Sequence, residues 1–93
     1  MRRLIWTSRA LDDIDGITDF LSEKNPIAAQ ELAIRCFDIV KNLQSHPELG
    51  RASALSDSRE LIVSGTNYLI GYRVLPDRIE VLGVWHGRRL PPG

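Results

Sequence analysis

The sequence has few of the residues that build metal sites, disulfides or membrane spans. It contains one cysteine, Cys36, and two histidines, His46 and His86, among 93 residues. A single cysteine excludes an internal disulfide, and these three residues lack the spacing of zinc ligands. No apolar run approaches the roughly 18 residues that a membrane-spanning helix needs. We therefore expect no metal site and no membrane association.

The chain is also too short for several domains. Residues 1–93 allow two or three layers of structure, with no room for separate cofactor and substrate domains. The first six residues lack the continuous apolar stretch of a secretion signal. We expect a single domain over residues 1–93, located in the cytoplasm and without a small-molecule cofactor.

Acidic and basic side chains balance overall but are distributed unevenly. Residues 1–50 hold six basic and eight acidic side chains, whereas residues 51–93 hold six basic and four acidic ones. An anion-binding surface is therefore expected in the second half. The excess is small, which argues against broad nucleic-acid affinity, because such affinity depends on many phosphate contacts.

The first half predicts one strand and two helices. Arg3–Trp6 reads as a short strand, after which Thr7 or Ser8 can cap a helix. The inward face of that helix is expected to carry residues at helical spacing, namely Leu11, Ile14, Thr18 and Leu21. The acidic residues between them are interpreted as a solvated face.

A second helix is expected to begin at Asn25-Pro26, because asparagine caps well and proline is tolerated at the first helical position. It should end before His46-Pro47, since proline disfavours a helical residue before it. Its apolar stripe includes Ala29, Leu32, Cys36, Ile39 or Val40, and Leu43. Cys36 is therefore interpreted as a core residue rather than a reactive thiol.

The second half changes to a period of two. After a surface loop carrying Arg51, three segments rich in Ile, Val, Leu and Tyr predict an antiparallel meander: Arg59–Ser64, Tyr68–Val74 and Arg78–His86. The predicted fold class is α+β, in the order β-α-α-β-β-β. The helical hairpin should pack on one face of a small, mainly antiparallel sheet.

The turn at Pro76-Asp77 fixes which residues share a face, and it places Arg73 opposite Glu80. One face is then almost wholly apolar and should form the floor for the helices: Tyr68, Ile70, Tyr72, Val74, Ile79, Val81 and Trp85. The other face is mixed and is expected to stay uncovered as a shallow binding surface: Leu69, Gly71, Arg73, Glu80, Leu82, Val84 and His86.

The first hairpin has two possible registers. A three-residue loop, 65–67, puts Arg59 opposite Arg73, and this alternative is favoured. A two-residue loop, Gly65-Thr66, instead puts Glu60 on the face of Arg73, because a slip of one residue exchanges the two faces of a strand. In either register Glu80 can neutralise Arg73, so Arg73 has both a structural and a target-binding interpretation.

The C-terminal segment contains two arginines, Arg88 and Arg89, and no acid. Gly87 ends the last strand, and the following prolines prevent further regular structure. A generic basic terminus is one interpretation. The alternative is that these arginines extend the mixed face as part of one contact surface.

Five segments, together with the order of the elements, resemble a known family. They are Asn25-Pro26-Ile27-Ala28-Ala29, His46-Pro47-Glu48-Leu49-Gly50-Arg51, Arg59-Glu60-Leu61-Ile62-Val63, Tyr72-Arg73-Val74, and Val84-Trp85-His86-Gly87-Arg88-Arg89. Over essentially the whole chain they resemble the ParE branch of the RelE/ParE toxins. These are the toxin halves of type II toxin–antitoxin pairs and are often described as plasmid stabilisation proteins.

The resemblance implies a ParD-like antitoxin partner whose extended C-terminal segment wraps the toxin. It also implies one of two targets. RelE-like members cleave mRNA on the ribosome, whereas ParE-like members poison DNA gyrase and block replication. The likeness favours gyrase, but the family alone does not fix the target.

RNA cleavage through the 2′-hydroxyl requires a base, an acid and a cation beside the phosphate. Glu60, His86 and Arg73 are the candidates for these three roles. The set is thin, because Glu60 reaches the mixed face in only one register and both lysines lie in the helical half.

Gyrase inhibition needs a complementary surface and no catalytic residues. The expected target-binding residues are Arg59, Arg73, His86, Arg88 and Arg89, because arginine makes charged, multi-donor contacts at interface hot spots. A third alternative is a non-toxic relative that has kept only the antitoxin-binding surface.

Overall fold

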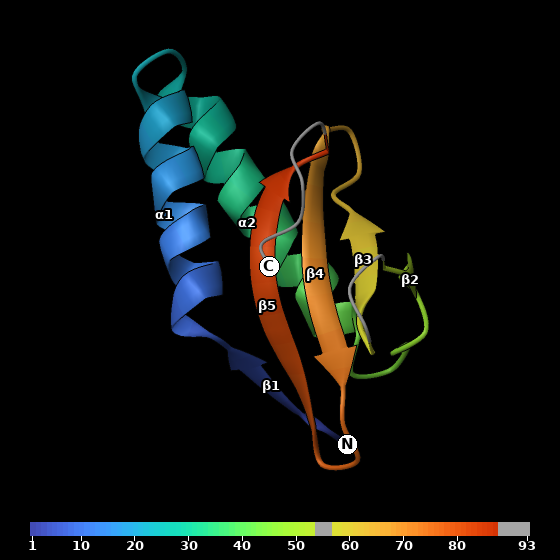
Figure 1. Cartoon of the computed structure of the whole chain (residues 1–93). Coiled ribbons are helices and arrows are strands. Elements are labelled where there is room, and N and C mark those ends of the chain that lie inside the picture. The colour runs from blue at the N-terminus through green and yellow to red at the C-terminus, as the bar shows by residue number, and fades with distance from the viewer. Residues whose placement is uncertain (54–56, 88–93) are drawn as a thin grey trace.

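The structure, a computed structural model, describes residues 1–53 and 57–87; in these residues two helices cover one face of a five-stranded sheet (Figure 1). The elements are β1 (Arg3–Trp6), α1 (Ser8–Ser22), α2 (Pro26–Asn42), β2 (Arg51–Ala52), β3 (Arg59–Ile62), β4 (Tyr68–Val74) and β5 (Arg78–His86). Strand order is β1-β5-β4-β3-β2, and β1 is parallel to β5 while the other neighbours are antiparallel. The predicted α+β fold is confirmed.

Both helices begin at the residues that the sequence indicates. The Thr7 hydroxyl accepts a hydrogen bond from the Ala10 amide at 3.2 Å, and the Asn25 side chain accepts one from Ala28 at 3.2 Å. Pro26 occupies the first turn of α2, where its missing N–H is not needed. Neither helix in the described residues is long and apolar enough to cross a membrane.

The core lies between the helices and the sheet. Cys36 is 1% exposed, and burial raises the pKa of its thiol to about 11, which confirms the interpretation of this residue as core. The predicted inward face of α1 is wrong in one position. Leu11 is 42% exposed and Ala10 is fully buried, because α1 turns Ala10 and Ile14 toward the core.

A β-bulge in β5 changes the predicted faces of its last residues. Arg73 pairs with Glu80 as predicted, and Tyr72 pairs with Val81, but Gly71 pairs with Gly83. Leu82 thus has no partner on β4, and every side chain of β5 after it lies on the face opposite to the predicted one.

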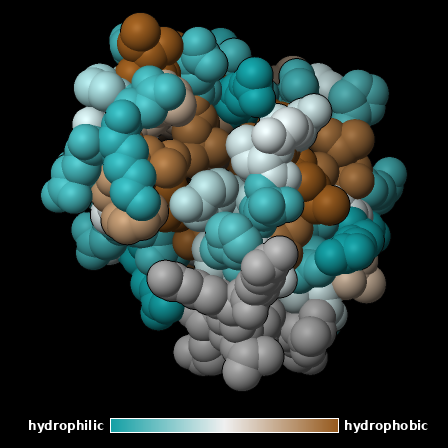
Figure 2. All heavy atoms as spheres, turned by 90° about the horizontal axis from the view of Figure 1, so that it is seen from above, coloured by the Kyte–Doolittle hydropathy of each residue, from teal (hydrophilic) through white to brown (hydrophobic). Residues whose placement is uncertain are grey.

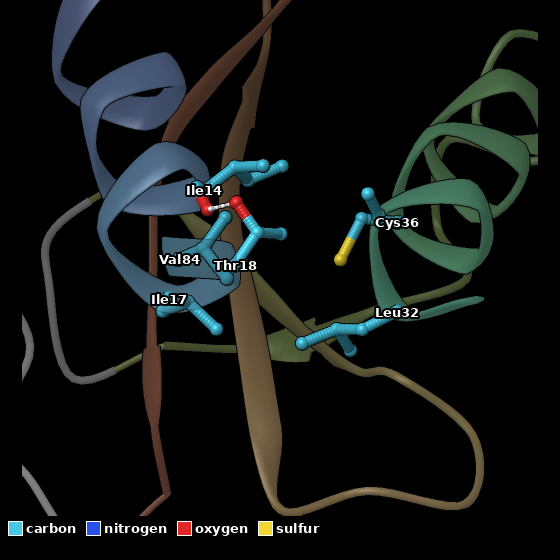
Figure 3. Close-up of a pocket in the computed structure, with 7 residues that line it drawn as sticks. Ile14, Ile17, Thr18, Leu32, Cys36 and Val84 are labelled. Atoms are coloured by element: carbon cyan, nitrogen blue, oxygen red, sulfur yellow. Dashed lines mark hydrogen bonds between the residues drawn. The ribbon is translucent and has the colours of Figure 1, made fainter. Parts of the chain in front are cut away.

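Two corrections to the predicted faces follow from this bulge. Val84, predicted on the uncovered face, lies under the helices and lines an apolar pocket with Ile14 and Leu32 (Figure 3). Trp85, predicted under the helices, lies on the opposite face, where its ring packs over Gly71.

Asp13 joins α1 to the edge of β5. Strand β1 pairs with β5 only as far as Val81, so the backbone of Val84 lies beyond the end of β1. The Asp13 carboxylate accepts a hydrogen bond from the Val84 amide at 2.9 Å. The sequence suggested that the acidic residues of α1 form a solvated face. Asp13 is an exception, because its carboxylate accepts the hydrogen bond of a backbone amide at the edge of β5.

Replacing Asp13 with alanine should lower the free energy of unfolding by about 1–3 kcal/mol, since the partly buried Val84 amide then lacks a partner. Chemical denaturation measures the change. Asp12→Ala is the matched control, because Asp12 is exposed and should have an effect below about 0.5 kcal/mol. Equal effects of the two substitutions would remove this role from Asp13.

Candidate functional site

The face of the sheet that points away from the helices is the predicted binding surface, and we call it the outer face. Side chains alternate between the two faces along β4 and β5, and Ile70, Tyr72 and Val81 pack toward the helices. The expectation that the outer face is uncovered holds for Arg73 but not for Leu69 and Trp85, which are buried there at 8% and 7% exposure. Arg73 and Glu80 lie on the outer face, as the sequence predicted. In Figure 1 this face is turned toward the viewer, with α1 and α2 beside and behind the sheet.

Two arginines on the outer face share one carboxylate. Arg73 donates to Oε1 of Glu80 from Nη2 at 2.8 Å and from Nε at 3.3 Å. Arg78, two residues before Glu80 on the same strand, donates from Nε to Oε2 at 3.0 Å. The hydrogen bonds from Arg73, and next those from Arg78, hold the pKa of Glu80 below its usual value. We call these three residues the Arg73–Glu80–Arg78 cluster. Sequence reasoning missed Arg78, although its spacing of two from Glu80 in a strand indicates a shared face.

The first hairpin has the register that the sequence did not favour. Glu60 pairs with Gly71 and Arg59 with Tyr72, while the Val63 amide donates to Tyr68 across a four-residue connection. This is the pairing of the two-residue alternative, so Glu60 lies on the outer face with Arg73, and Arg59 does not. Glu60 accepts from Arg51 of β2 at 2.8 Å, in a strand that the sequence analysis read as loop.

Arg59 lies on the helix side of the sheet and stabilises the connection before β2. Its Nη1 donates to the Gly50 carbonyl at 2.7 Å. The buried Tyr72 hydroxyl accepts from the Gly50 amide at 2.7 Å and donates to the Pro47 carbonyl at 2.8 Å. Burial raises the pKa of Tyr72, which keeps this hydroxyl protonated and able to donate. Gly50 is thus fixed on both sides by side chains of the sheet.

His86 is also separated from Arg73. It pairs with Tyr68, and its ring packs edge-on against the Tyr68 ring with centroids 5.5 Å apart. Tyr68 packs against the core between the helices and the sheet. The prediction that His86 shares a face with Arg73 is therefore wrong, because the bulge at Leu82 exchanges the faces.

The candidates for RNA cleavage are accordingly divided by the sheet. Glu60 and Arg73 lie on the outer face, and His86 lies on the other. Of the five predicted target-binding residues, the structure places Arg73 on the outer face and Arg59 and His86 on the helix side. Arg88 and Arg89 lie outside the described residues.

Charges on the outer face are nearly balanced. The outer face and the turn at its end carry four arginines and three carboxylates in the described part of the chain: Arg3, Arg51, Arg73, Arg78, Glu60, Asp77 and Glu80. Each of these arginines has a carboxylate within 4 Å. Within residues 1–53 and 57–87 no group of histidine, cysteine or acidic side chains could hold a metal ion.

The helices carry a second candidate surface. Ile27, Ile34 and Phe37 are 69%, 53% and 45% exposed and lie on one side of α2, and we call them the α2 stripe. Phe37 also packs against Trp6 of β1, with ring centroids 4.7 Å apart. Seen from the end that carries the α1–α2 connection, apolar patches are separated by hydrophilic side chains (Figure 2). Exposed apolar residues aligned on one helix indicate a protein-binding surface.

Comparison with known proteins agrees with this architecture. The family profile for the ParE toxin of the type II toxin–antitoxin system parDE matches residues 4–91. Toxin RelE2 of Caulobacter vibrioides is 36% identical over 90 residues, which covers 97% of this chain and all of that protein.

Solved structures extend the comparison. A chain of the chromosomal ParDE toxin–antitoxin system of P. aeruginosa superposes with a TM-score of 0.84 and 27% identity, over 92% of this chain and 96% of that one. The YoeB dimer of Staphylococcus aureus shares the fold alone, with a TM-score of 0.62 and 11% identity over 91% of this chain and 97% of that one. The chain therefore belongs to the ParE toxin family of type II toxin–antitoxin systems.

Proposed function

We propose that this toxin acts in the cytoplasm by inhibiting DNA gyrase through a binding surface, and that a ParD-like antitoxin neutralises it. The observation that carries the proposal is the separation of His86 from Glu60 and Arg73 by the sheet. An acid and a base that act on one phosphate must both reach it, each at hydrogen-bond distance. A binding mechanism has no such requirement.

The outer face is the proposed gyrase-binding surface, in which Arg73 lies beside the β4–β5 turn. Arg88 and Arg89, outside the described residues, stay predicted target contacts. An inhibitor of this kind needs only to bind one state of the enzyme more tightly than the others. Arginines that keep free donors suit such contacts, because the guanidinium is weakly hydrated and has five donors. Target-binding roles for Arg59 and His86 stay predictions, and they require a partner that reaches the helix side.

The α2 stripe is the proposed antitoxin-binding surface. The matched P. aeruginosa structure is of a ParDE system, which supports an antitoxin partner for this chain too. Ile34 and Phe37 are one turn apart on α2, so an amphipathic segment can place apolar side chains on both. Charged residues flank the stripe, among them Glu31, Arg35 and Asp38, and can fix the orientation of the segment.

One observation favours the alternative, ribosome-dependent mRNA cleavage of the RelE type. Glu60 lies on the outer face within one diagonal position of Arg73, where a carboxylate could act as base beside a cation. In the described structure, however, Glu60 is held by Arg51 at 2.8 Å. The Arg51 guanidinium therefore occupies a Glu60 oxygen that could otherwise accept the proton.

Induced expression in growing cells distinguishes the two targets. Incorporation of labelled thymidine and labelled methionine is followed from the moment of induction. We expect DNA synthesis to stop first, while mRNA stays intact and translation continues. Early arrest of translation with mRNA cut at ribosome-bound codons would instead establish the alternative. Growth without either arrest, at normal toxin levels, would identify a non-toxic relative that only binds antitoxin.

A further inference from the structure

In the Arg73–Glu80–Arg78 cluster, the Glu80 carboxylate binds both guanidinium groups. Glu80 contacts Arg73 through Nη2 and Nε, and it contacts Arg78 through Nε. The second contact of Arg78 runs from Nη1 to Asp77 at 2.8 Å. Among the contacts of the described residues, Nη1 of Arg73 and Nη2 of Arg78 are not used. Each guanidinium therefore keeps donors that point away from Glu80.

We propose that Glu80 is a positioning residue, which holds Arg73 and Arg78 as a preformed receptor for a carboxylate of an acidic protein segment. This inference deepens the proposed function, because it assigns a partner chemistry to the outer face. Two long side chains that are already held in place lose less conformational entropy on binding than two free ones. A planar guanidinium with unused donors donates hydrogen bonds to a carboxylate with defined geometry.

The charge balance of the outer face favours a protein carboxylate over a nucleic acid. Four arginines face three carboxylates there, so the net charge of the described outer face is about one positive unit. Nucleic-acid binding depends on many phosphate contacts and would be opposed by Glu60, Asp77 and Glu80. At the cluster itself Arg73 and Arg78 are matched by Glu80 and Asp77, so it offers a single carboxylate unused donors rather than a strong positive field.

The burial of the cluster supports positioning rather than a loose surface pair. The side chain of Glu80 is 18% exposed, whereas those of Arg73 and Arg78 are 44% and 35% exposed. The carboxylate is thus less accessible than the two arginine side chains that it binds. The hydrogen bonds that Glu80 accepts from Arg73 and Arg78 also lower its pKa.

The test is binding of a rhodamine-labelled alanine peptide with one central glutamate and an amidated C-terminus to the 93-residue protein, measured by fluorescence anisotropy at low salt. Glu80→Gln should weaken binding about tenfold, because Arg73 and Arg78 lose their common anchor. The same substitution in an Arg73→Ala/Arg78→Ala background should have no further effect. Glu60→Gln is the matched control on the same face and should leave the affinity unchanged or slightly higher.

A spectroscopic measurement separates positioning from a general effect on folding. In the wild type the Nε–H groups of Arg73 and Arg78 should give slowly exchanging NMR cross-peaks near pH 6.5, and both should be lost in Glu80→Gln while the backbone spectrum is kept.

Three results would overturn the inference. The first is tighter peptide binding by Glu80→Gln, which would show that Glu80 blocks the two arginines instead of positioning them. The second is a loss of peptide affinity in Glu60→Gln as large as that in Glu80→Gln. The third is tighter binding of a 12-nucleotide RNA than of the peptide. None of these measurements involves gyrase, so failure of the inference is distinguishable from failure of the proposed function.

Discussion

Replacing Gly50 with alanine should destabilise the protein by about 3–5 kcal/mol, which is a large share of the stability of a small domain. A Cβ at this position would lie 2.7 Å from the Glu60 carbonyl oxygen and 2.7 Å from Cε1 of Tyr72. One of these neighbours is backbone, and the other is a fully buried ring, so neither can move easily. The hydrogen bonds that Gly50 makes with Tyr72 and Arg59 would be strained as well.

The measurement is equilibrium unfolding in denaturant, with Gly16→Ala as control. A Cβ at Gly16 meets nothing within 4 Å, and this residue lies inside α1, where alanine is favoured over glycine. Gly16→Ala should therefore raise stability by about 0.5–1 kcal/mol. Wild-type stability in Gly50→Ala would contradict the packing of the 46–50 connection against β3 and β4.

At the proposed antitoxin-binding surface, replacing Phe37 with aspartate should weaken binding of the antitoxin by about 100-fold, because an aromatic side chain that the partner would cover is lost and a charge enters an apolar interface. Phe37 is 45% exposed in the toxin alone and lies on the α2 stripe, next to Trp6. The affinity is measured by calorimetry with the proposed ParD-like antitoxin, after circular dichroism has confirmed that the variant folds.

Phe20→Asp is the matched control for this substitution. Phe20 is 56% exposed, more than Phe37, but it lies near the end of α1, where Lys24 packs over its ring at 4.9 Å. We expect less than a threefold effect from this change, since its position is off the stripe. Equal losses in the two variants, or none in Phe37→Asp, would place the antitoxin elsewhere.

The helices and the last two strands could be predicted from the sequence because their signals are local. Thr7, Asn25 and Pro26 specify helix starts by backbone chemistry that acts over three residues. The Pro76-Asp77 turn fixed the pairing of Arg73 with Glu80 for the same reason. These features depend little on the rest of the chain.

The candidate site was harder to predict, because it depends on register. The extra residue Leu82 exchanged the faces of Val84, Trp85 and His86. Gly71 and Gly83, which pair with each other, were the signal for the changed register. The Trp85 ring packs against Gly71, where a Cβ would lie only 2.7 Å from the ring. The alternation of side chains along one strand cannot reveal the bulge, because it does not show whether that strand has one residue more than the strand it pairs with.

Register also decided the first hairpin. Whether Arg59 or Glu60 shares a face with Arg73 depends on the length of the connection between β3 and β4. Residues 64–67 form this connection, between the hydrogen-bonded Val63 and Tyr68. Arg35 donates to the Ser64 carbonyl at 3.0 Å and supports this connection from α2. Such a tertiary contact, 29 residues apart in sequence, could not be read from local pattern.

Inhibition of gyrase in a purified system tests the central proposal most directly. DNA supercoiling by gyrase and ATP is followed while toxin is added, alone or premixed with its antitoxin. We expect supercoiling to fall at toxin concentrations close to that of gyrase, because the toxin acts by binding, and to recover with antitoxin. Full gyrase activity in excess toxin, together with cleavage of ribosome-bound mRNA by catalytic amounts of the same toxin, would contradict the account.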